Sequence, residues 1–535
     1  MRVQSLIRCA IFFGCFLRSS AVDPLVDVGF TRYLGTPLAN GVTQWLGMRF
    51  AAPPLGNLRF RAPVDPPTNR SIQLANQHGA VCLSTGTSFP ATGLAEDCLF
   101  IEVFAPSKAT TTSKLPVFFF IQGGGFNSDS NPNMNGTGLV TAGDMDLIVV
   151  SFNYRVGPYG FLASKEVMNN GSINVGLLDQ RKALEWVHAN IAKFGGDPGH
   201  VVLGGDSAGA ESITLQMTAF GGAPTNLFQA VIGESQSFPT TLTVPQAQFQ
   251  YDALVQRVGC ANASDTLACL RTTPIDVLQN ANIAIPFPGR ANPPDFLYNA
   301  IIDGDFLVDL PFRLFTEGKF VKVPSVFGDD TNEGTIFTPS NLTSVSDMDN
   351  FLLDNFPNLT SSMLTTINSL YPEGPQFPSR GSFFSAAATV YGEMRYICPG
   401  IFISSAINQF RSPSPNWNYH YNVIDPDEQA SGLGVPHTVE LHAIWGVNNT
   451  NGGTPASYFT TNAPIIPIMQ GYWTSFIRTF NPNTHKDPSA PQWEPFGTGK
   501  NRILMQTNAT KMEVVPSDQD ARCNFLHSIG IALQQ

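Results

Sequence analysis

A serine in a glycine-rich turn is the residue of this chain best placed to act as a nucleophile. Ser207 lies in the sequence GGDSAG (204–209), which follows an apolar run and precedes a stretch with helical character. Glycines two positions either side of a serine, between a strand and a helix, indicate a nucleophile elbow, where a sharp turn exposes the hydroxyl. Because the short motif alone is common, its strand-before, helix-after context is what favours catalysis over an incidental serine in a turn.

A serine hydroxyl is a weak nucleophile near neutral pH, so it needs a base, an orienting acid and donors for the oxyanion. The sequence QGGGF (122–126) follows another apolar run. We expect the backbone N–H groups of Gly124 and Gly125, together with that of Ala208, to form the oxyanion hole. Glycines also form phosphate-binding loops, but no Lys-Ser or Lys-Thr pair follows these.

The elbow predicts the order serine, acid, histidine along the chain. After Ser207, the sequence GDDTNEG follows an apolar run and offers three candidate acids: Asp329, Asp330 and Glu333. Further on, the sequence GVPHTVE places His437 in a loop shaped by Gly and Pro. The residues alone do not choose among the three carboxylates, nor between His437 and the other nearby histidines, His420 and His442.

The elements that carry these loops follow from hydrophobic periodicity. Buried strands are predicted at 117–121, 147–152 and 201–203, where apolar runs rich in β-branched and aromatic residues end at Gly or Asn. Residues 177–194 have the period of a helix and stop at two glycines. Strands alternating with helices predict an α/β fold with a parallel sheet. We expect one domain over 22–535, since no repeat or linker divides it, and predict no topology for the second half.

Composition excludes several classes of function. The chain has 535 residues, of which 43% are hydrophobic and 13% charged, so it can bury a large core. Its formal charge is −11, which argues against a nucleic-acid partner. No apolar run reaches the about 18 residues of a membrane-spanning helix. No CxxC motif occurs, so we expect neither a metal site nor a cofactor.

The N-terminus and the cysteines predict an oxidising compartment. Residues 1–21 contain two early arginines, an apolar stretch and small residues near Ala21, which is typical of a secretory signal peptide. The even number of cysteines left after cleavage, six, suggests three disulfides: closeness in sequence favours Cys82–Cys98 and Cys260–Cys269, which leaves Cys398 for Cys523. Eight N-x-S/T sequons predict surface glycosylation of a secreted protein: Asn69, Asn135, Asn170, Asn262, Asn341, Asn358, Asn448 and Asn508.

Several motifs together resemble a known family. They are FGGDPGHVVLGGDSAG (194–209), EDCL (96–99), NYRVG (153–157), GFL (160–162) and the QGGGF turn. The chain resembles the type-B carboxylesterase/lipase family, the cholinesterase-like branch of the α/β-hydrolases, in the form of a secreted fungal member. The resemblance implies an α/β-hydrolase fold, a mostly parallel twisted sheet flanked by helices and carrying large loop and helical insertions. It also implies Glu333 as the acid, His437 as the base, the same disulfide pairs and a supporting hydroxyl at Ser212.

The resemblance implies a serine carboxylic ester hydrolase that works through an acyl-enzyme and acts on a small-molecule ester. Neither a protein partner nor an oligomeric state follows from the sequence. Only 15 residues separate Cys82 from Cys98, and few of them are large and apolar. We therefore favour soluble or short-chain esters. The alternatives are a lipase or sterol esterase, an acyltransferase or lactone-opening enzyme, and an inactive adhesion module, which the intact Ser207, Glu333 and His437 set argues against. Asp206 and Gln122 depart from the residues usual in the family, which leaves substrate preference open.

Overall fold

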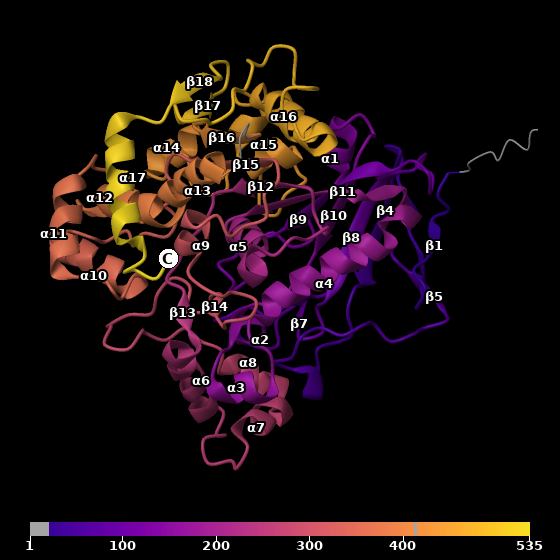
Figure 1. Cartoon of the computed structure of the whole chain (residues 1–535), viewed down its shortest axis with the longest axis horizontal. Coiled ribbons are helices and arrows are strands. Elements are labelled where there is room, and N and C mark those ends of the chain that lie inside the picture. Colours follow the sequence, from indigo (N-terminus) through magenta and orange to yellow (C-terminus); the bar gives the residue numbers. More distant parts are fainter. Residues whose placement is uncertain (1–20, 411–414) are drawn as a thin grey trace, which may run out of the picture.

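A large twisted sheet forms the centre of the molecule (Figure 1). The structure is a computed structural model that describes residues 21–410 and 415–535, so most of the expected signal peptide lies outside the described residues. In the described part, the sheet has eleven strands. Across the sheet they are β18 (Lys511–Val514), β17 (Asn501–Met505), β16 (Asn416–Tyr421), β15 (Ser325–Asp330), β12 (Ala230–Glu234), β11 (Gly196–Asp206), β9 (Leu115–Ile121), β10 (Ile148–Phe152), β8 (Phe100–Pro106), β4 (Val42–Arg49) and β3 (Thr36–Pro37).

The middle of this sheet is parallel and its margins are antiparallel. Every neighbouring pair from β17 to β10 is parallel, whereas β18, β8, β4 and β3 pair antiparallel. The mostly parallel sheet expected from the sequence is therefore confirmed. Because parallel strands end at the same edge, the segments that follow β9, β11, β15 and β16 all start there.

Strand β9 shows why helices cover both faces of the sheet. Phe118 and Phe120 pack in one core and Val117 and Phe119 in another, as the alternation of side chains along a strand requires. On the first face lie α1 (Thr137–Ala142), α15 (Leu441–Trp445) and α16 (Ile465–Thr479). On the second lie α4 (Val175–Asn190), α5 (Ala208–Gly222) and α13 (Cys398–Phe410). The strands between them are buried on both sides, which explains their nearly continuous apolar runs.

The predicted elements of the first half correspond to observed ones. The three expected strands overlap β9, β10 and β11, and the expected helix is α4 followed by a 3-10 turn, η2 (Ile191–Phe194). Gly195 ends this turn with a φ of +93°, a conformation that glycine adopts without strain. The second half, for which no topology was predicted, adds β15, β16, β17 and β18 to the same sheet.

Further helices form two groups around this core. The group at the bottom of Figure 1 contains α2 (Gly157–Phe161), α3 (Lys165–Asn170), α6 (Val244–Arg257), α7 (Thr266–Thr272) and α8 (Ile275–Asn280). The group at the left contains α10 (Val345–Asn355), α11 (Ser361–Leu370), α12 (Phe384–Gly392) and α17 (Ser517–Gly530). The second group has a hydrophobic core of its own, around residues such as Phe351 and Leu526. Two further short helices are α9 (Pro311–Thr316), which contacts α5 and α13, and α14 (Pro426–Ser431), which follows β16 in the chain.

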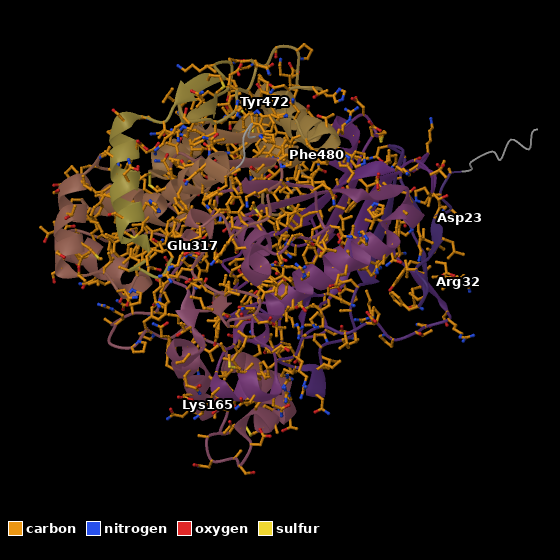
Figure 2. The ribbon with its side chains drawn as sticks, viewed as in Figure 1. Asp23, Arg32, Lys165, Glu317, Tyr472 and Phe480 are labelled. Atoms are coloured by element: carbon orange, nitrogen blue, oxygen red, sulfur yellow. A yellow bond between two sulfur atoms is a disulfide. The ribbon has the colours of Figure 1, made fainter. Side chains whose placement is uncertain are left out.

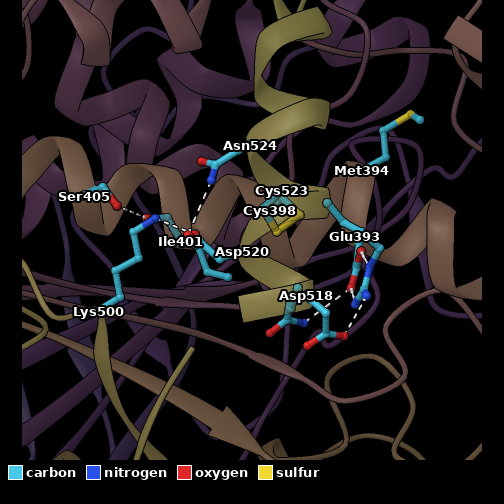
Figure 3. The surroundings of a disulfide bond; sticks show 12 residues. Glu393, Met394, Cys398, Ile401, Ser405, Lys500, Asp518, Asp520, Cys523 and Asn524 are labelled. Carbon is cyan, nitrogen blue, oxygen red and sulfur yellow. Dashed lines mark hydrogen bonds and ion pairs between the residues drawn. A yellow bond between two sulfur atoms is a disulfide. The ribbon is translucent and has the colours of Figure 1, made fainter. Parts of the chain in front are cut away.

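Three disulfides are formed: Cys82–Cys98, Cys260–Cys269 and Cys398–Cys523. The last of them ties α13 to α17 (Figure 3). On either side of it, Lys500 pairs with Asp520, and Arg522 forms an ion pair with Glu393. This cross-link fixes the C-terminal helix against α13, directly after the turn Glu393–Ile397.

The surface carries charged and glycosylatable side chains. Asp23, Arg32, Lys165 and Glu317 are exposed on the outside of the molecule (Figure 2). All eight sequon asparagines are exposed as well. Within the described residues, no helix has both the length and the apolar character that crossing a membrane requires.

Candidate active site

Ser207 sits in a strained turn between β11 and α5. Its φ is 54° and its ψ is −121°, a conformation that residues with a Cβ rarely adopt. The turn is held by the close approach of β9, since a Cβ on Gly209 would lie 1.9 Å from the carbonyl oxygen of Ile121. The Ser207 N–H donates to the Glu234 carbonyl (2.9 Å). The two glycines of the motif therefore permit the contact that presents the serine.

The loop after β9 lies beside this turn. The Gly123 N–H donates to Asp206 Oδ1 (2.9 Å), which fastens the loop to the residue before the serine. Gly124 and Gly125 have φ values of +114° and +59°, which favour glycine. Their N–H groups, and that of Ala208, donate no hydrogen bond to any described residue. Three backbone donors beside the serine are thus free to bind an oxygen atom.

Glu333 and His437 meet in two loops that follow β15 and β16. Glu333 Oε2 contacts His437 Nδ1, and Glu333 Oε1 accepts from the Asp330 N–H (2.7 Å). Two further hydrogen bonds join the loops: the Asn332 N–H donates to the Val435 carbonyl, and the Val435 N–H donates to the Asn332 side chain at Oδ1, both at 2.9 Å. The carboxylate and the imidazole are therefore held as one unit.

The other candidate acids and histidines have different partners. Asp330 Oδ2 accepts from the Val439 N–H (3.2 Å), and Asp329 lies against Gly400. His420 contacts Glu513 and Thr331, both at 2.9 Å. His442 contacts Thr450. Of the three carboxylates and three histidines left open by the sequence, only Glu333 and His437 contact each other.

The structure does not bring Ser207 and His437 into hydrogen-bond contact. His437 Nε2 is buried and has no partner among the described residues. Ser207 and His437 are only 7% and 8% exposed. Both side chains are therefore largely shielded from solvent, and Nε2 of His437 is left unoccupied by any described protein group.

Burial sets the charge state of the carboxyl group beside the serine. It raises the pKa of Asp206 to about 7, while the nearby His437 and the hydrogen bond from Gly123 oppose that rise. Asp206 Oδ2 also accepts from the Asn131 side chain (3.1 Å). Asp206 thus ionises near neutral pH, close enough to His437 to interact with its charge.

A second buried carboxyl group supports the histidine loop. Glu440 Oε1 accepts from the Tyr419 hydroxyl (2.9 Å). Burial and the proximity of Glu333 raise the pKa of Glu440, and burial together with Glu440 and Glu333 raises that of Asp330. The fold therefore buries several carboxyl groups around the Glu333–His437 pair.

Aromatic rings complete the walls. The rings of Tyr396 and Phe337 lie 4.4 and 5.1 Å from the imidazole of His437. Phe296 packs against Phe337 (5.7 Å) and against Gly125, where a Cβ would lie 2.0 Å from its ring. An apolar group bound at the serine would contact these rings. A separate cavity of about 320 Å³ adjoins Glu333, but Ser207 does not line it, so it is distinct from this site.

Comparison with known proteins identifies the family. The model of the carboxylesterase family matches residues 26–526. The chain belongs to the carboxylesterase family. A crystal structure of EstA from Aspergillus niger matches with a TM-score of 0.94 and 44% identity, over 96% of this chain and 99% of that one. The protein therefore has the α/β-hydrolase fold and is a carboxylic ester hydrolase.

Fungal relatives are similar along most of this carboxylesterase. Secreted lipase 4 of Gibberella zeae is 29% identical over 504 residues, covering 89% of this chain and 86% of the relative. Secreted triacylglycerol lipase LIP1 of the same species is 31% identical over 525 residues, covering 89% of this chain and 85% of the relative.

Some residues of this carboxylesterase's site carry no sequence signal. Tyr396 and Arg395 lie in a short π-helical turn, η3 (Glu393–Ile397), far in sequence from every motif. Glu440 follows His437 closely, but nothing in its spacing marks it as buried. Ser212, expected to support the site, donates to the Ala208 carbonyl (2.7 Å) and accepts from Gln180 (2.8 Å). Its hydroxyl thus ties α4 to the residue that follows Ser207, and the supporting role expected from the resemblance stays a prediction.

Proposed function

We propose that this carboxylesterase hydrolyses soluble or short-chain esters through Ser207, His437 and Glu333. The observation that carries the proposal is the contact between Glu333 and His437 Nδ1, which leaves His437 Nε2 without a protein partner beside the elbow. A carboxylate on Nδ1 keeps the other nitrogen available as a base and stabilises the imidazolium that forms.

The chemistry proceeds in two halves. Ser207 Oγ bonds to the ester carbonyl carbon while its proton passes to His437, and the N–H groups of Gly124, Gly125 and Ala208 stabilise the oxyanion. The bond to the alcohol oxygen then breaks, and His437 gives that oxygen the proton. Water, deprotonated by His437, attacks the acyl-enzyme and releases the acid, which restores the serine.

The loop closed by the first disulfide supports small or soluble esters. Leu83 is buried, while Phe89 and Leu94 are partly buried against the main core. Among residues 83–97, no large hydrophobic side chain is exposed. Such a loop lacks the apolar face with which a lipid-activated flap would contact an oil droplet.

A lipase is the second candidate, because relatives similar over most of the chain bear that name. Rates measured with a short-chain ester, through its solubility limit, separate the two. We expect saturation before the limit and no jump beyond it. A sharp rise when emulsion forms would establish the lipase instead.

The serine is tested by covalent labelling. An organophosphonate should label the wild-type protein at Ser207 and stop ester hydrolysis, and Ser207→Ala should neither react nor hydrolyse. Labelling elsewhere, or hydrolysis by the alanine variant, would contradict the mechanism.

We also propose that the protein is secreted as one domain over residues 22–535, with sugar on exposed sequons. The names of the relatives, the three disulfides and the exposed sequons support this. Both halves of the chain contribute to one sheet, which supports a single domain. Mass spectrometry of protein recovered from the culture medium should show cleavage near Ala21 and a mass decrease on deglycosylation. A single unfolding transition is expected.

A further inference from the structure

Arg395 is a buried cation that no carboxylate neutralises directly. It lies in η3 and is 3% exposed. Its Nε donates to the Ser237 hydroxyl (3.2 Å). Its two terminal nitrogens donate no hydrogen bond, and it forms no ion pair, within the described part of the chain. Since buried charges are normally paired, these free donors call for a partner from outside the protein.

The guanidinium of Arg395 contacts two aromatic rings that themselves pack against the proposed site. Its carbon stands 4.9 Å from the centre of the Phe296 ring and 5.7 Å from that of Tyr396. Phe296 packs on Gly125 of the oxyanion loop, and Tyr396 contacts His437. Phe296 thus joins the oxyanion loop to Arg395, so a short acyl chain attached to Ser207 that follows this ring would end near the guanidinium.

Two acidic side chains face this cation. Glu211 is buried on α5, and burial raises its pKa to about 8 although Arg395 opposes that rise. It is therefore mainly protonated below that pH. Burial raises the pKa of Asp295 to about 6 although Arg395 opposes that rise, and the two side chains form no ion pair within the described residues. The positive charge is thus left with two free, forked donors, a geometry that suits a carboxylate.

We propose that Arg395 binds a carboxylate on the acyl part of the substrate, so that the enzyme prefers half-esters of short dicarboxylic acids. The proposal rests on the proposed function, because the acyl chain must be attached to Ser207 for its far end to reach Arg395. The neutral aromatic wall holds the methylene groups, and the guanidinium holds the terminal charge.

The test compares two esters that differ at the far end of the acyl chain. Monomethyl succinate carries a carboxylate, and methyl isocaproate carries an isopropyl group of similar shape in its place. We measure kcat/KM for both and take their ratio. The wild-type enzyme should favour monomethyl succinate, and Arg395→Met should lower the ratio on the order of 10- to 100-fold, the loss expected for a hydrogen bond between charged groups. Arg395→Lys should retain part of the preference, since it keeps the charge but lacks the fork.

Three controls make the outcome decisive. Arg313→Met removes an exposed arginine on α9 and should leave the ratio unchanged. If Arg395→Met lowers both activities equally, the arginine only packs against the rings, and the proposal is overturned. A wild-type preference for methyl isocaproate overturns it as well, without any variant. Hydrolysis of either ester by Ser207→Ala would instead overturn the proposed function itself.

Discussion

Two regions of this carboxylesterase position its proposed reactive groups by different means. The nucleophile region (residues 122–126 and 204–209) is fixed locally, by glycines that let one strained turn contact the neighbouring strand. The acid–base region (residues 329–334 and 434–440) is fixed by contacts between distant loops and by buried carboxyl groups. The comparison indicates that backbone geometry positions the proposed nucleophile, whereas contacts with buried carboxyl groups position the proposed base. Substitutions in one region therefore test whether the other region is affected.

The largest effect should come from the nucleophile region. Ser207→Ala should lower kcat by about 10⁶-fold, because it removes the attacking oxygen. Ser207→Gly should be equally inactive yet more stable than the alanine variant by about 1 kcal/mol, since glycine tolerates the positive φ of the turn. Ester hydrolysis and thermal unfolding measure the two effects. Equal stability of the variants would show that the turn is not strained.

In the acid–base region, Glu333→Gln should lower kcat by about 10⁴-fold, because a neutral amide does not stabilise the imidazolium. The matched control is Asp330→Asn, whose carboxyl group contacts the Val439 N–H rather than the histidine. Steady-state kinetics at constant pH measure both. A greater loss of kcat with Asp330→Asn than with Glu333→Gln would identify Asp330 as the acid and contradict this account of the acid–base region.

Asp206 links the two regions, so its replacement should have a moderate effect. Ionised Asp206 stabilises positive charge on His437, and its pKa of about 7 means that this help increases as pH rises through neutrality. Asp206→Asn should therefore lower kcat about tenfold at pH 8, equivalent to one pKa unit of interaction. The loss should be smaller at pH 6. A pH-independent loss would instead indicate that Asp206 acts through the Gly123 hydrogen bond.

The smallest effect concerns stability. Burial raises the pKa of Glu440 above its ordinary value of 4.5 in the folded state. At pH values between 4.5 and the folded-state pKa, the folded protein therefore binds more protons than the unfolded chain. Stability consequently falls as pH rises from about 4.5 through the folded-state pKa. Glu440→Gln removes this titration. Relative to wild type, its unfolding free energy should therefore increase as pH rises through the folded-state pKa of Glu440. Exposed Glu317→Gln is the control, and parallel pH curves for wild type and Glu440→Gln would count against the electrostatic account.

The difference between the regions also explains what the sequence could predict. Ser207 and the glycines around it form one local pattern, and a local pattern with its flanking strand and helix is readable without a structure. Glu333 and His437 were open choices among neighbours, and the resemblance to a family was needed to select them. Arg395 and Tyr396 reach the site only because η3 packs beside it, a long-range contact that no spacing encodes.

The two hydrogen bonds between Asn332 and Val435 have a practical consequence for protein engineering. To transplant His437 to another scaffold, residues 329–334 and 434–440 must be moved together, because either segment alone would lose the hydrogen bonds that hold its conformation. Insertions into one segment should likewise be tolerated only when the other changes with it. Libraries that diversify both segments jointly are therefore the better starting point for altered pH behaviour.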